Sequence, residues 1–190
     1  MNAMTAASPQ RMTAEQFLAL PPREDTCRLE LIEGEVVVLS QPTPLHQLAV
    51  VNLVFAIKTW TTAAAGRGFV TLNIDTGIDD WNVLSPDVQW YAADRELPAL
   101  DRPPWPLGDL VIEVRSPSTW HRDVGIKRQI YEREGARELW LVDPPARSVL
   151  LFRRSGAAAT FDVTAEVGGD ERLESPLLPG FAIATAELFA

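Results

Sequence analysis

The sequence DLVIEVRSPST, residues 109–119, places a carboxylate inside a segment that otherwise has the pattern of a buried β-strand. Residues 110–114 are strand formers apart from Glu113. Side chains alternate between the two faces of a strand, so Glu113 and Arg115 share one face. A lone buried carboxylate is costly unless it is paired or binds a metal. Two interpretations follow: an ion pair with Arg115 or a nearby lysine, or a ligand for a divalent cation.

A second carboxylate and a lysine favour the metal interpretation. Asp87 lies in SPDVQWYAA, a predicted strand over residues 85–93 that we expect beside the strand of Glu113. Two carboxylates from neighbouring strands, together with water and a substrate phosphate, suit Mg²⁺. Lys127 lies on a predicted helix over residues 120–135, from which its ammonium group could offset phosphate charge. The ordinary alternatives are a turn residue for Asp87 and a surface lysine for Lys127.

The order of strand and helix patterns predicts a mixed α/β fold. The helix over 120–135 joins two predicted strands in a β-α-β arrangement, which belongs to a mixed sheet with helices packed on it. The longest predicted helix runs from about Leu45 to Ala64, and its apolar stripe consists of Leu48, Val51, Phe55 and Thr59. The other expected elements are a short helix in 13–22, hairpin strands 28–32 and 35–39, a strand in 67–78, a proline-rich loop over 96–108, two strands in 137–154, and a strand or two with a short helix near the C-terminus.

Length and composition indicate one domain and exclude several classes of protein. The chain has 190 residues, 46% hydrophobic and 23% charged, as is ordinary for a globular protein. We expect a flexible tail over residues 1–12 and a single domain over residues 13–190. No apolar stretch approaches the roughly 20 residues that span a bilayer, and no signal peptide is recognisable. Cys27 is the single cysteine and cannot form an intrachain disulfide, so we expect a cytoplasmic protein without a membrane partner.

The net charge of −9 argues against non-specific coating of nucleic acid, which needs a positive surface. The charge is unevenly distributed, however. Residues 115–137 contain six basic and three acidic side chains, a local charge of +3, so the rest of the chain carries −12. This segment could attract a phosphate backbone locally, although runs of charge more often form a solvated helix face.

Seven stretches, read in order, resemble the Uma-type restriction endonuclease family, a branch of the PD-(D/E)XK nuclease superfamily. Together they cover the chain from about Met12 to Phe189: MTAEQFLALP, RLELIEGEVV, PTPLHQ, SPDVQWY, DLVIEVRSPST, DVGIKRQIYEREGARELWLVDP and SPLLPGF. The resemblance implies a restriction-endonuclease-like core, in which helices flank a central mixed β-sheet and a metal site lies where the sheet splays open. It further implies an endonuclease that uses Mg²⁺ or Mn²⁺ to hydrolyse phosphodiester bonds in nucleic acid, with DNA as the expected substrate and a homodimer as the expected assembly.

The resemblance assigns the catalytic residues one by one. Asp87 takes the place of the aspartate in the Pro-Asp motif, Glu113 takes the place of the D/E residue, and both are the expected metal ligands. Position 115 departs from the pattern because it is arginine, which stays protonated and cannot act as a general base. Lys127 matches a lysine that has moved to the following helix. Glu30 matches an acidic residue that the superfamily often adds near the metal.

Further residues are candidates for substrate contact and support. The expected contacts to phosphate or nucleic acid are Arg115, Arg122 and Arg128, since one guanidinium group can donate two parallel hydrogen bonds to a phosphate. His46 and Tyr131 are expected to support the site, His46 from the start of the long helix and Tyr131 from one turn beyond Lys127.

Two alternatives to the endonuclease stay open. The first is a catalytically inactive nuclease fold used for binding or assembly, which the arginine at position 115 favours. The second is a metal-dependent hydrolase of small phosphoesters. A cleft lined by Arg122, Lys127 and Arg128 and wide enough for a duplex would favour the nuclease, whereas a closed pocket would favour the small substrate.

Overall fold

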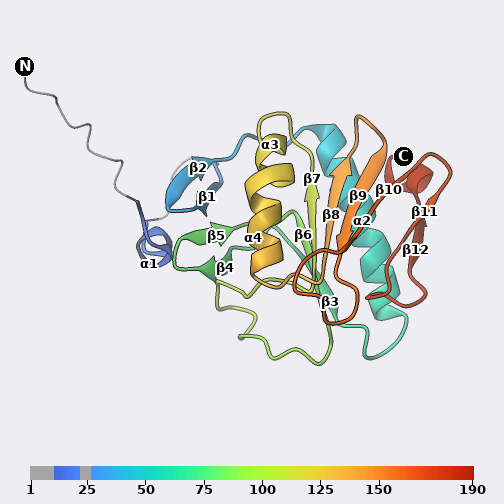
Figure 1. The fold of residues 1–190 in the computed structure, drawn as a ribbon, viewed down its shortest axis with the longest axis horizontal. Helices are drawn as coiled ribbons and strands as arrows, with labels where there is room; N and C mark the ends of the chain where they lie inside the picture. The colour runs from blue at the N-terminus through green and yellow to red at the C-terminus, as the bar shows by residue number, and fades with distance from the viewer. Residues whose placement is uncertain (1–10, 22–26) are drawn as a thin grey trace, which may run out of the picture.

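A six-stranded sheet forms the centre of the protein, seen here in a computed structural model that describes residues 11–21 and 27–190 (Figure 1). The strand order is β10-β9-β8-β7-β6-β3, with β7 and β8 parallel and every other neighbouring pair antiparallel. The predicted mixed sheet is therefore confirmed. Its strands are β3 (Phe69–Leu72), β6 (Val88–Tyr91), β7 (Leu110–Val114), β8 (Glu138–Asp143), β9 (Ser148–Arg153) and β10 (Val163–Gly168).

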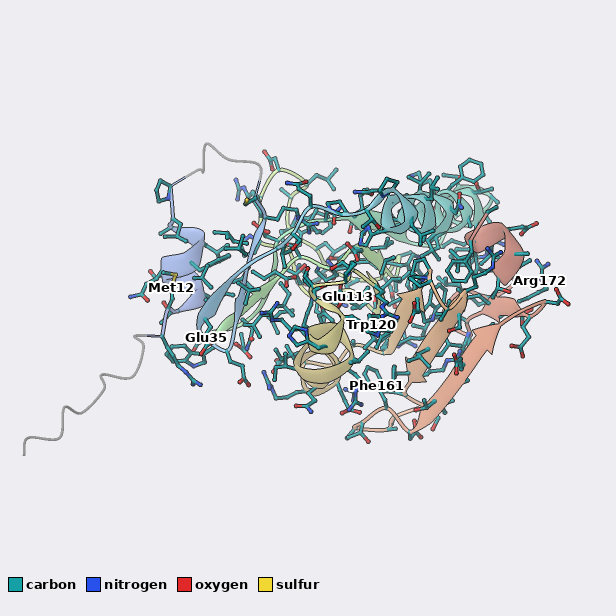
Figure 2. The ribbon with its side chains drawn as sticks, turned by 90° about the horizontal axis from the view of Figure 1, so that it is seen from above. Met12, Glu35, Glu113, Trp120, Phe161 and Arg172 are labelled. Carbon is teal, nitrogen blue, oxygen red and sulfur yellow. The ribbon has the colours of Figure 1, made fainter. Side chains whose placement is uncertain are left out.

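The parallel pair is joined by one continuous crossover helix with three parts. These are α3 (Trp120–Arg122), the π-helical turn η1 (Asp123–Lys127) and α4 (Arg128–Arg133). The β-α-β arrangement expected for this part of the chain is thus present. Its helix covers one face of the sheet, while the long helix α2 (Pro44–Thr62) covers the other (Figure 2).

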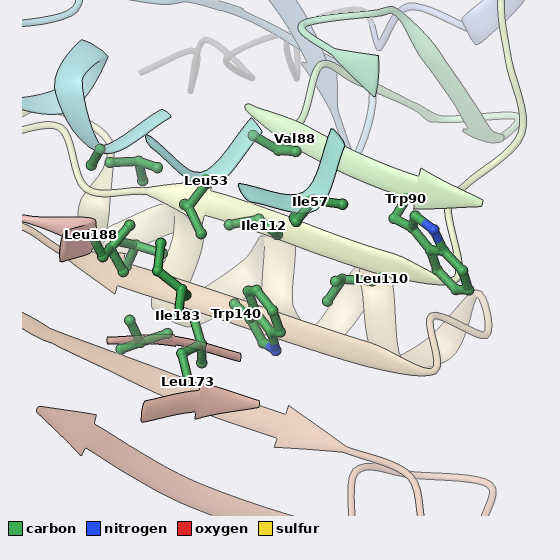
Figure 3. Close-up of a cluster of buried hydrophobic side chains, with 14 of the residues drawn as sticks. Leu53, Ile57, Val88, Trp90, Leu110, Ile112, Trp140, Leu173, Ile183 and Leu188 are labelled. Atoms are coloured by element: carbon green, nitrogen blue, oxygen red, sulfur yellow. The ribbon is translucent and has the colours of Figure 1, made fainter. Parts of the chain in front are cut away.

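The alternation of side chains along β7 divides the core into two layers. Ile112 and Val114 pack on the α2 side, together with Leu53 and Ile57 of that helix (Figure 3). Val111 packs on the opposite side, against the crossover helix. Because Glu113 follows the same alternation as Val111, its carboxylate is directed to the crossover helix and away from the larger apolar cluster.

A smaller four-stranded sheet lies beside the central one, in the order β2-β1-β5-β4. The predicted hairpin is present as β1 (Leu29–Ile32) and β2 (Glu35–Val38), and β5 (Asn82–Leu84) pairs with both β1 and β4 (Thr76–Asp79). The helix α1 (Ala14–Leu18) packs against this sheet and begins with a capping box between Thr13 and Gln16. The predicted tail over 1–12 lies outside the described residues except for Arg11 and Met12.

The chain passes between the two sheets three times: from β2 through α2 to β3, from β3 to β4, and from β5 to β6. The prediction of a single strand in 67–78 is wrong, because β3 ends at Leu72 and β4 begins at Thr76 in the other sheet. Asn73 separates them with a φ of 49°, a conformation that interrupts an extended strand. The chain then returns through residues 85–87, which link β5 to β6. This return segment carries Asp87 to the junction of the sheets.

The apolar stripe expected on the long helix is also wrong. Leu48, Val51, Phe55 and Thr59, which we call the outer face of α2, are exposed to solvent. The buried side chains lie on the opposite side of the helix: His46, Ala49, Val50, Leu53, Ile57, Trp60 and Thr61. Apolar residues surround α2 on nearly all sides, so spacing alone did not identify the face that meets the sheet.

The C-terminal segment completes the α2 layer. The hairpin of β11 (Arg172–Glu174) and β12 (Ala182–Ala184) leads into α5 (Thr185–Leu188), as expected for the end of the chain. Leu173, Phe181 and Leu188 join the apolar cluster under α2. Among the helices that the structure describes, none is long and apolar enough to cross a membrane.

A buried carboxylate ties this C-terminal segment to the central sheet. Glu138, at the start of β8, is fully buried and accepts hydrogen bonds from three donors. The donors are Trp140 Nε1 at 2.7 Å, Arg153 Nη2 at 3.1 Å and Ser175 Oγ at 2.6 Å. Removing the carboxylate would leave these donors, one of them charged, without their acceptor.

We therefore expect Glu138→Leu to lower the free energy of unfolding by about 3–5 kcal/mol, the usual effect of breaking a buried ion pair. Urea denaturation followed by circular dichroism measures the change. Glu174→Leu, on the exposed edge of β11, is the matched control and should change stability by less than about 0.5 kcal/mol. A Glu138 variant as stable as the control would show that the network does not support the fold.

Candidate functional site

Four carboxylates from separate elements gather around one lysine where the two sheets meet. Glu30 comes from β1, Asp87 from the segment before β6, Glu113 from β7 and Asp123 from the start of η1, and all four are buried. Figure 2 shows Glu113 near the middle of the molecule, between the strands of the two sheets. Lys127 lies at the end of η1 with 4% of its surface exposed. The junction of the two sheets is therefore acidic, and the ammonium group of Lys127 lies at its centre.

Lys127 holds this cluster together. Its Nζ lies 2.7 Å from Glu113 Oε1, 3.0 Å from Glu30 Oε1 and 3.6 Å from Asp123 Oδ1. The backbone N–H of Ser85 donates to the same Glu30 oxygen at 2.9 Å. These contacts join the smaller sheet, the central sheet and the crossover helix through a single ammonium group.

The crossover helix, whose middle turn is π-helical, turns one face toward the site. Residues four apart are neighbours on the surface of a helix. Asp123, Lys127 and Tyr131 accordingly share the face that meets β7, and all three are buried. Such single π turns are frequent at functional sites.

Asp87 is fixed by two contacts to the same oxygen. The backbone N–H of Val114 donates to Asp87 Oδ2 at 2.8 Å, and His46 Nε2 lies 3.2 Å from that oxygen. His46 belongs to the first turn of α2, where Thr43 caps the helix. The α2 N-terminus thus orients Asp87, and the bond from Val114 places Asp87 directly beside Glu113.

Two contacts hold one oxygen of Glu113, and the pKa of its carboxyl is strongly raised. Its Oε1 accepts a hydrogen bond from the Tyr131 hydroxyl in addition to the contact with Lys127. Burial raises the pKa of the Glu113 carboxyl to about 8, against the opposing effect of Lys127. The neighbouring carboxylates add to this rise: Asp123, Asp87 and Glu30.

The pKa values of Asp123 and Lys127, which interact with Glu113, are raised as well. Burial raises the pKa of Asp123, and Lys127 opposes this rise. For Lys127, burial lowers the pKa, but the surrounding acidic groups, led by Glu113 and Glu30, outweigh burial and raise it well above its ordinary value. Lys127 therefore keeps its proton, and the site carries more negative charge than its lysine neutralises.

A small cavity of about 50 Å³ opens onto the cluster. Its wall includes Glu30, Asp87, Glu113 and Lys127. Arg28 also lines it, with its Nη2 donating to the backbone oxygen of Ser85 at 3.0 Å. Among the described residues that line this cavity, Arg28 and Lys127 are the basic ones apart from His46.

The donor set suits a hard divalent cation in part. Counted as ionised, four carboxylates against one ammonium group leave a charge of −3, and oxygen donors are those that Mg²⁺ and Mn²⁺ prefer. His46 Nδ1 is also buried without a hydrogen-bond partner among the described residues. No three acidic, histidine or cysteine side chains of the described part form a ready metal cage. Asp87 and Glu113 are the two groups expected from sequence to hold a cation, and with them alone water and substrate would have to supply the remaining ligands.

The structure brings together six of the residues predicted from sequence: Glu30, His46, Asp87, Glu113, Lys127 and Tyr131. Sequence reasoning did not count Asp123, Arg28 or Ser85 as part of the site. The spacing of four between Asp123 and Lys127 was the available signal for Asp123, since such residues meet on a helix. No comparable signal marked Arg28, which depends on the packing of β1 against β5.

The three arginines expected to contact phosphate lie elsewhere. Arg115 follows β7 and pairs with Asp143 at 2.6 Å, with its guanidinium group over the Trp120 ring. Arg128 lies over the Phe152 ring, 5.3 Å from its centroid, and Arg122 does not line the cavity. Contact of these arginines with nucleic acid stays a prediction, and it would have to occur outside the cavity.

A solved structure shares this architecture. It is described as a putative nuclease belonging to DUF820 from Anabaena variabilis, and it superposes with a TM-score of 0.75 over 94% of this chain and 97% of that chain. The two sequences are 20% identical, so the likeness concerns the fold. No curated protein matches the chain.

The family comparison covers nearly the whole sequence. The model of the Uma2 family, described as "Putative restriction endonuclease", matches residues 14–186. The matched range begins at the first residue of α1 and ends within α5, so it includes Lys127, the four carboxylates around it, His46 and Tyr131. The chain belongs to the Uma2 family of putative restriction endonucleases.

Proposed function

We propose that this protein is a metal-dependent endonuclease that hydrolyses phosphodiester bonds in nucleic acid, with DNA as its substrate. The observation that carries the proposal is the convergence of Asp87, Glu113 and Lys127 in one buried cavity at the sheet junction. Membership of a family of putative restriction endonucleases supports the same class of reaction. Carboxylates can hold a divalent cation and a lysine can offset phosphate charge, so these groups suit metal-assisted phosphoryl transfer.

Asp87 and Glu113 would hold Mg²⁺ or Mn²⁺, which when bound lowers the pKa of a water ligand and polarises a phosphate oxygen. The protein keeps these ligands in place. Val114 and His46 fix Asp87 through Oδ2, while Tyr131 and Lys127 fix Glu113 through Oε1. The ligand oxygens are thus positioned before any substrate arrives.

Lys127 and Arg28 have separate roles in this proposal. Because the pKa of Lys127 is raised, its ammonium group stays charged and offsets the charge that develops on the phosphate. The lysine missing at position 115 is supplied from the crossover helix, since Nζ reaches Glu113 at 2.7 Å. Arg28, at the wall of the cavity, is placed to contact a phosphate oxygen of the substrate.

A second candidate is a hydrolase of small phosphoesters. The cavity volume of about 50 Å³ favours this candidate, because the cavity is too small to admit a nucleic-acid duplex. A duplex could react only if one of its phosphates entered the cavity or if the cleft were wider. The same residues would perform the same chemistry on a smaller substrate. Comparing supercoiled plasmid with bis(p-nitrophenyl) phosphate under identical conditions distinguishes the two substrates.

We expect the wild type to nick supercoiled plasmid in the presence of Mn²⁺, and Asp87→Asn and Lys127→Met to reduce the rate at least about a hundredfold. Gel electrophoresis of the plasmid measures the rate. The matched controls are Asp170→Asn and Lys58→Met, both at exposed positions, and both should retain activity. Equal nicking by all five proteins would remove the assignment of the site.

We also expect Mn²⁺ to raise the melting temperature of the wild type, because an ion that binds only the folded state stabilises it. At a hundred times the dissociation constant the gain is about 2.7 kcal/mol. Differential scanning calorimetry with and without Mn²⁺ measures the shift. Asp87→Asn should lose most of it and Asp170→Asn should keep it. A shift of the same size in both variants would place the metal elsewhere.

Arg28→Ala should weaken substrate use without weakening the metal site. We expect kcat/KM for plasmid to fall about tenfold to a hundredfold, the effect of losing one charged hydrogen bond, while the Mn²⁺-induced shift in melting temperature is unchanged. Arg172→Ala, on the exposed edge of β11, is the control. An unchanged kcat/KM would show that Arg28 does not touch the substrate.

A further inference from the structure

A second, larger hollow lies next to the small cavity of the candidate site. Its volume is about 610 Å³, against about 50 Å³ for the cavity. Arg28 and Ser85 line both spaces and form the boundary between them. The hollow is within the roughly 300–1,000 Å³ typical of pockets that hold small organic molecules. The cavity therefore has room for a phosphate group, and the hollow has room for the group attached to that phosphate.

One part of the hollow is apolar. Phe17 and Leu18 of α1, Leu20 and Pro21 just beyond that helix, and Leu29 of β1 all line it. Leu18 and Leu20 are each 40% exposed, so their side chains are open to a ligand. Enzymes that bind an unstacked base hold its faces against apolar or aromatic side chains. This part of the hollow therefore suits the face of a planar heterocycle.

Another part of the hollow is polar and rigid. It consists of Asn73 and Asp75, from the segment that joins β3 to β4. The backbone N–H of Asn73 donates to the backbone oxygen of Pro86 at 3.2 Å. The backbone oxygen of Asp75 accepts from the N–H of Trp105 at 3.0 Å. Both residues are thus held in place before a ligand arrives.

Ser85 connects Asp75 with the lysine-centred site. Its Oγ donates to Asp75 Oδ1 at 2.7 Å, and its backbone N–H donates to Glu30 Oε1 at 2.9 Å. A carboxylate offers about four acceptor positions, so the bond from Ser85 leaves room for further donors. Guanine carries two adjacent donors on its Watson–Crick edge, N1–H and the N2 amino group, whereas the other bases carry one donor group there. Asp75 therefore favours guanine.

We propose that the hollow binds an unpaired guanine nucleotide of DNA, with the base against the apolar part and its Watson–Crick edge at Asp75. This site rests on the proposed function, because the phosphate attached to the nucleotide would lie in the cavity at Arg28. A base whose Watson–Crick edge meets Asp75 cannot be paired at the same time. The substrate is therefore single-stranded DNA, or a duplex with one guanine turned out of the stack.

Fluorescence anisotropy tests the base site without hydrolysis. The protein is the full chain with Asp87→Asn, which removes one negative charge near the phosphate and prevents cleavage. The probe is a fluorescein-labelled single-stranded oligothymidylate whose central nucleotide is guanine, adenine, cytosine or thymine. We expect the guanine probe to bind about tenfold more tightly than the other three, the effect of one bidentate contact. Pairing each probe with its complement should abolish this preference.

Two further substitutions test the two parts of the hollow. Asp75→Asn should abolish the preference for guanine, because an amide replaces one acceptor by a donor; Asp170→Asn, at an exposed position, should keep it. Leu18→Ser leaves the bond between Ser85 and Asp75 intact and should weaken binding of the guanine probe about fivefold. Leu100→Ser, at an 86% exposed leucine, is its control and should bind normally. Far-UV circular dichroism and melting temperature verify that each variant is folded.

The possible failures of the base site and of the nuclease proposal are distinguishable. No measurable binding, equal affinity for the four single-stranded probes, or a guanine preference that survives Asp75→Asn or persists in the duplex would each overturn the base site. None of these results depends on cleavage, so the nuclease proposal would stand. A wild type that cleaves neither plasmid nor bis(p-nitrophenyl) phosphate would remove the nuclease proposal, whereas a guanine preference lost in Asp75→Asn would still support the base site.

Discussion

The burial of one ammonium group among four carboxylates constrains the whole site. Removing charges from water is costly, and a buried cluster with unequal numbers of acids and bases is costlier than a matched pair. Lys127 contacts three of the four carboxylates directly, and burial, with a smaller contribution from the neighbouring carboxylates, raises the pKa of Glu113 and of Asp123. A site of this kind gains little stability from its own contacts. Its surplus of oxygen donors is the basis of our proposal that the site binds a cation.

The arrangement of the elements follows from this constraint. The four carboxylates come from β1, β7, η1 and the 85–87 segment, so the two sheets and the crossover helix must all meet at one point. The chain achieves this by leaving the central sheet after β3 and returning through residues 85–87 into β6. The crossover helix then brings Lys127 and Tyr131 into contact with Glu113. Apolar packing on both faces of the sheet provides the rigidity that holds these groups in place.

The sequence was sufficient where local pattern and side-chain alternation decide the outcome. The strand around Glu113, the strand after Asp87 and the crossover helix with Lys127 were all predicted, because each depends on neighbours in the sequence. The resemblance to the family added Glu30, which the structure places against Lys127.

Other features depend on packing between distant segments and could not be predicted in this way. The buried face of α2 was misjudged because both sides of that helix are apolar, and contact with the sheet decides between them. The strand expected in 67–78 is divided because its second half pairs in another sheet. Arg115 lies beyond the end of β7, where its partner Asp143 is 28 residues away, and Arg28 reaches the cavity only through the pairing of β1 with β5.

A crystal structure of the protein with Mn²⁺, in which anomalous diffraction locates the ion, tests whether Asp87 and Glu113 bind a metal. We expect an anomalous peak within the roughly 2 Å of a metal–oxygen bond from one oxygen each of Asp87 and Glu113. Crystals at saturating Mn²⁺ with no peak at these two carboxylates, or with the ion bound only elsewhere on the chain, would contradict this expectation.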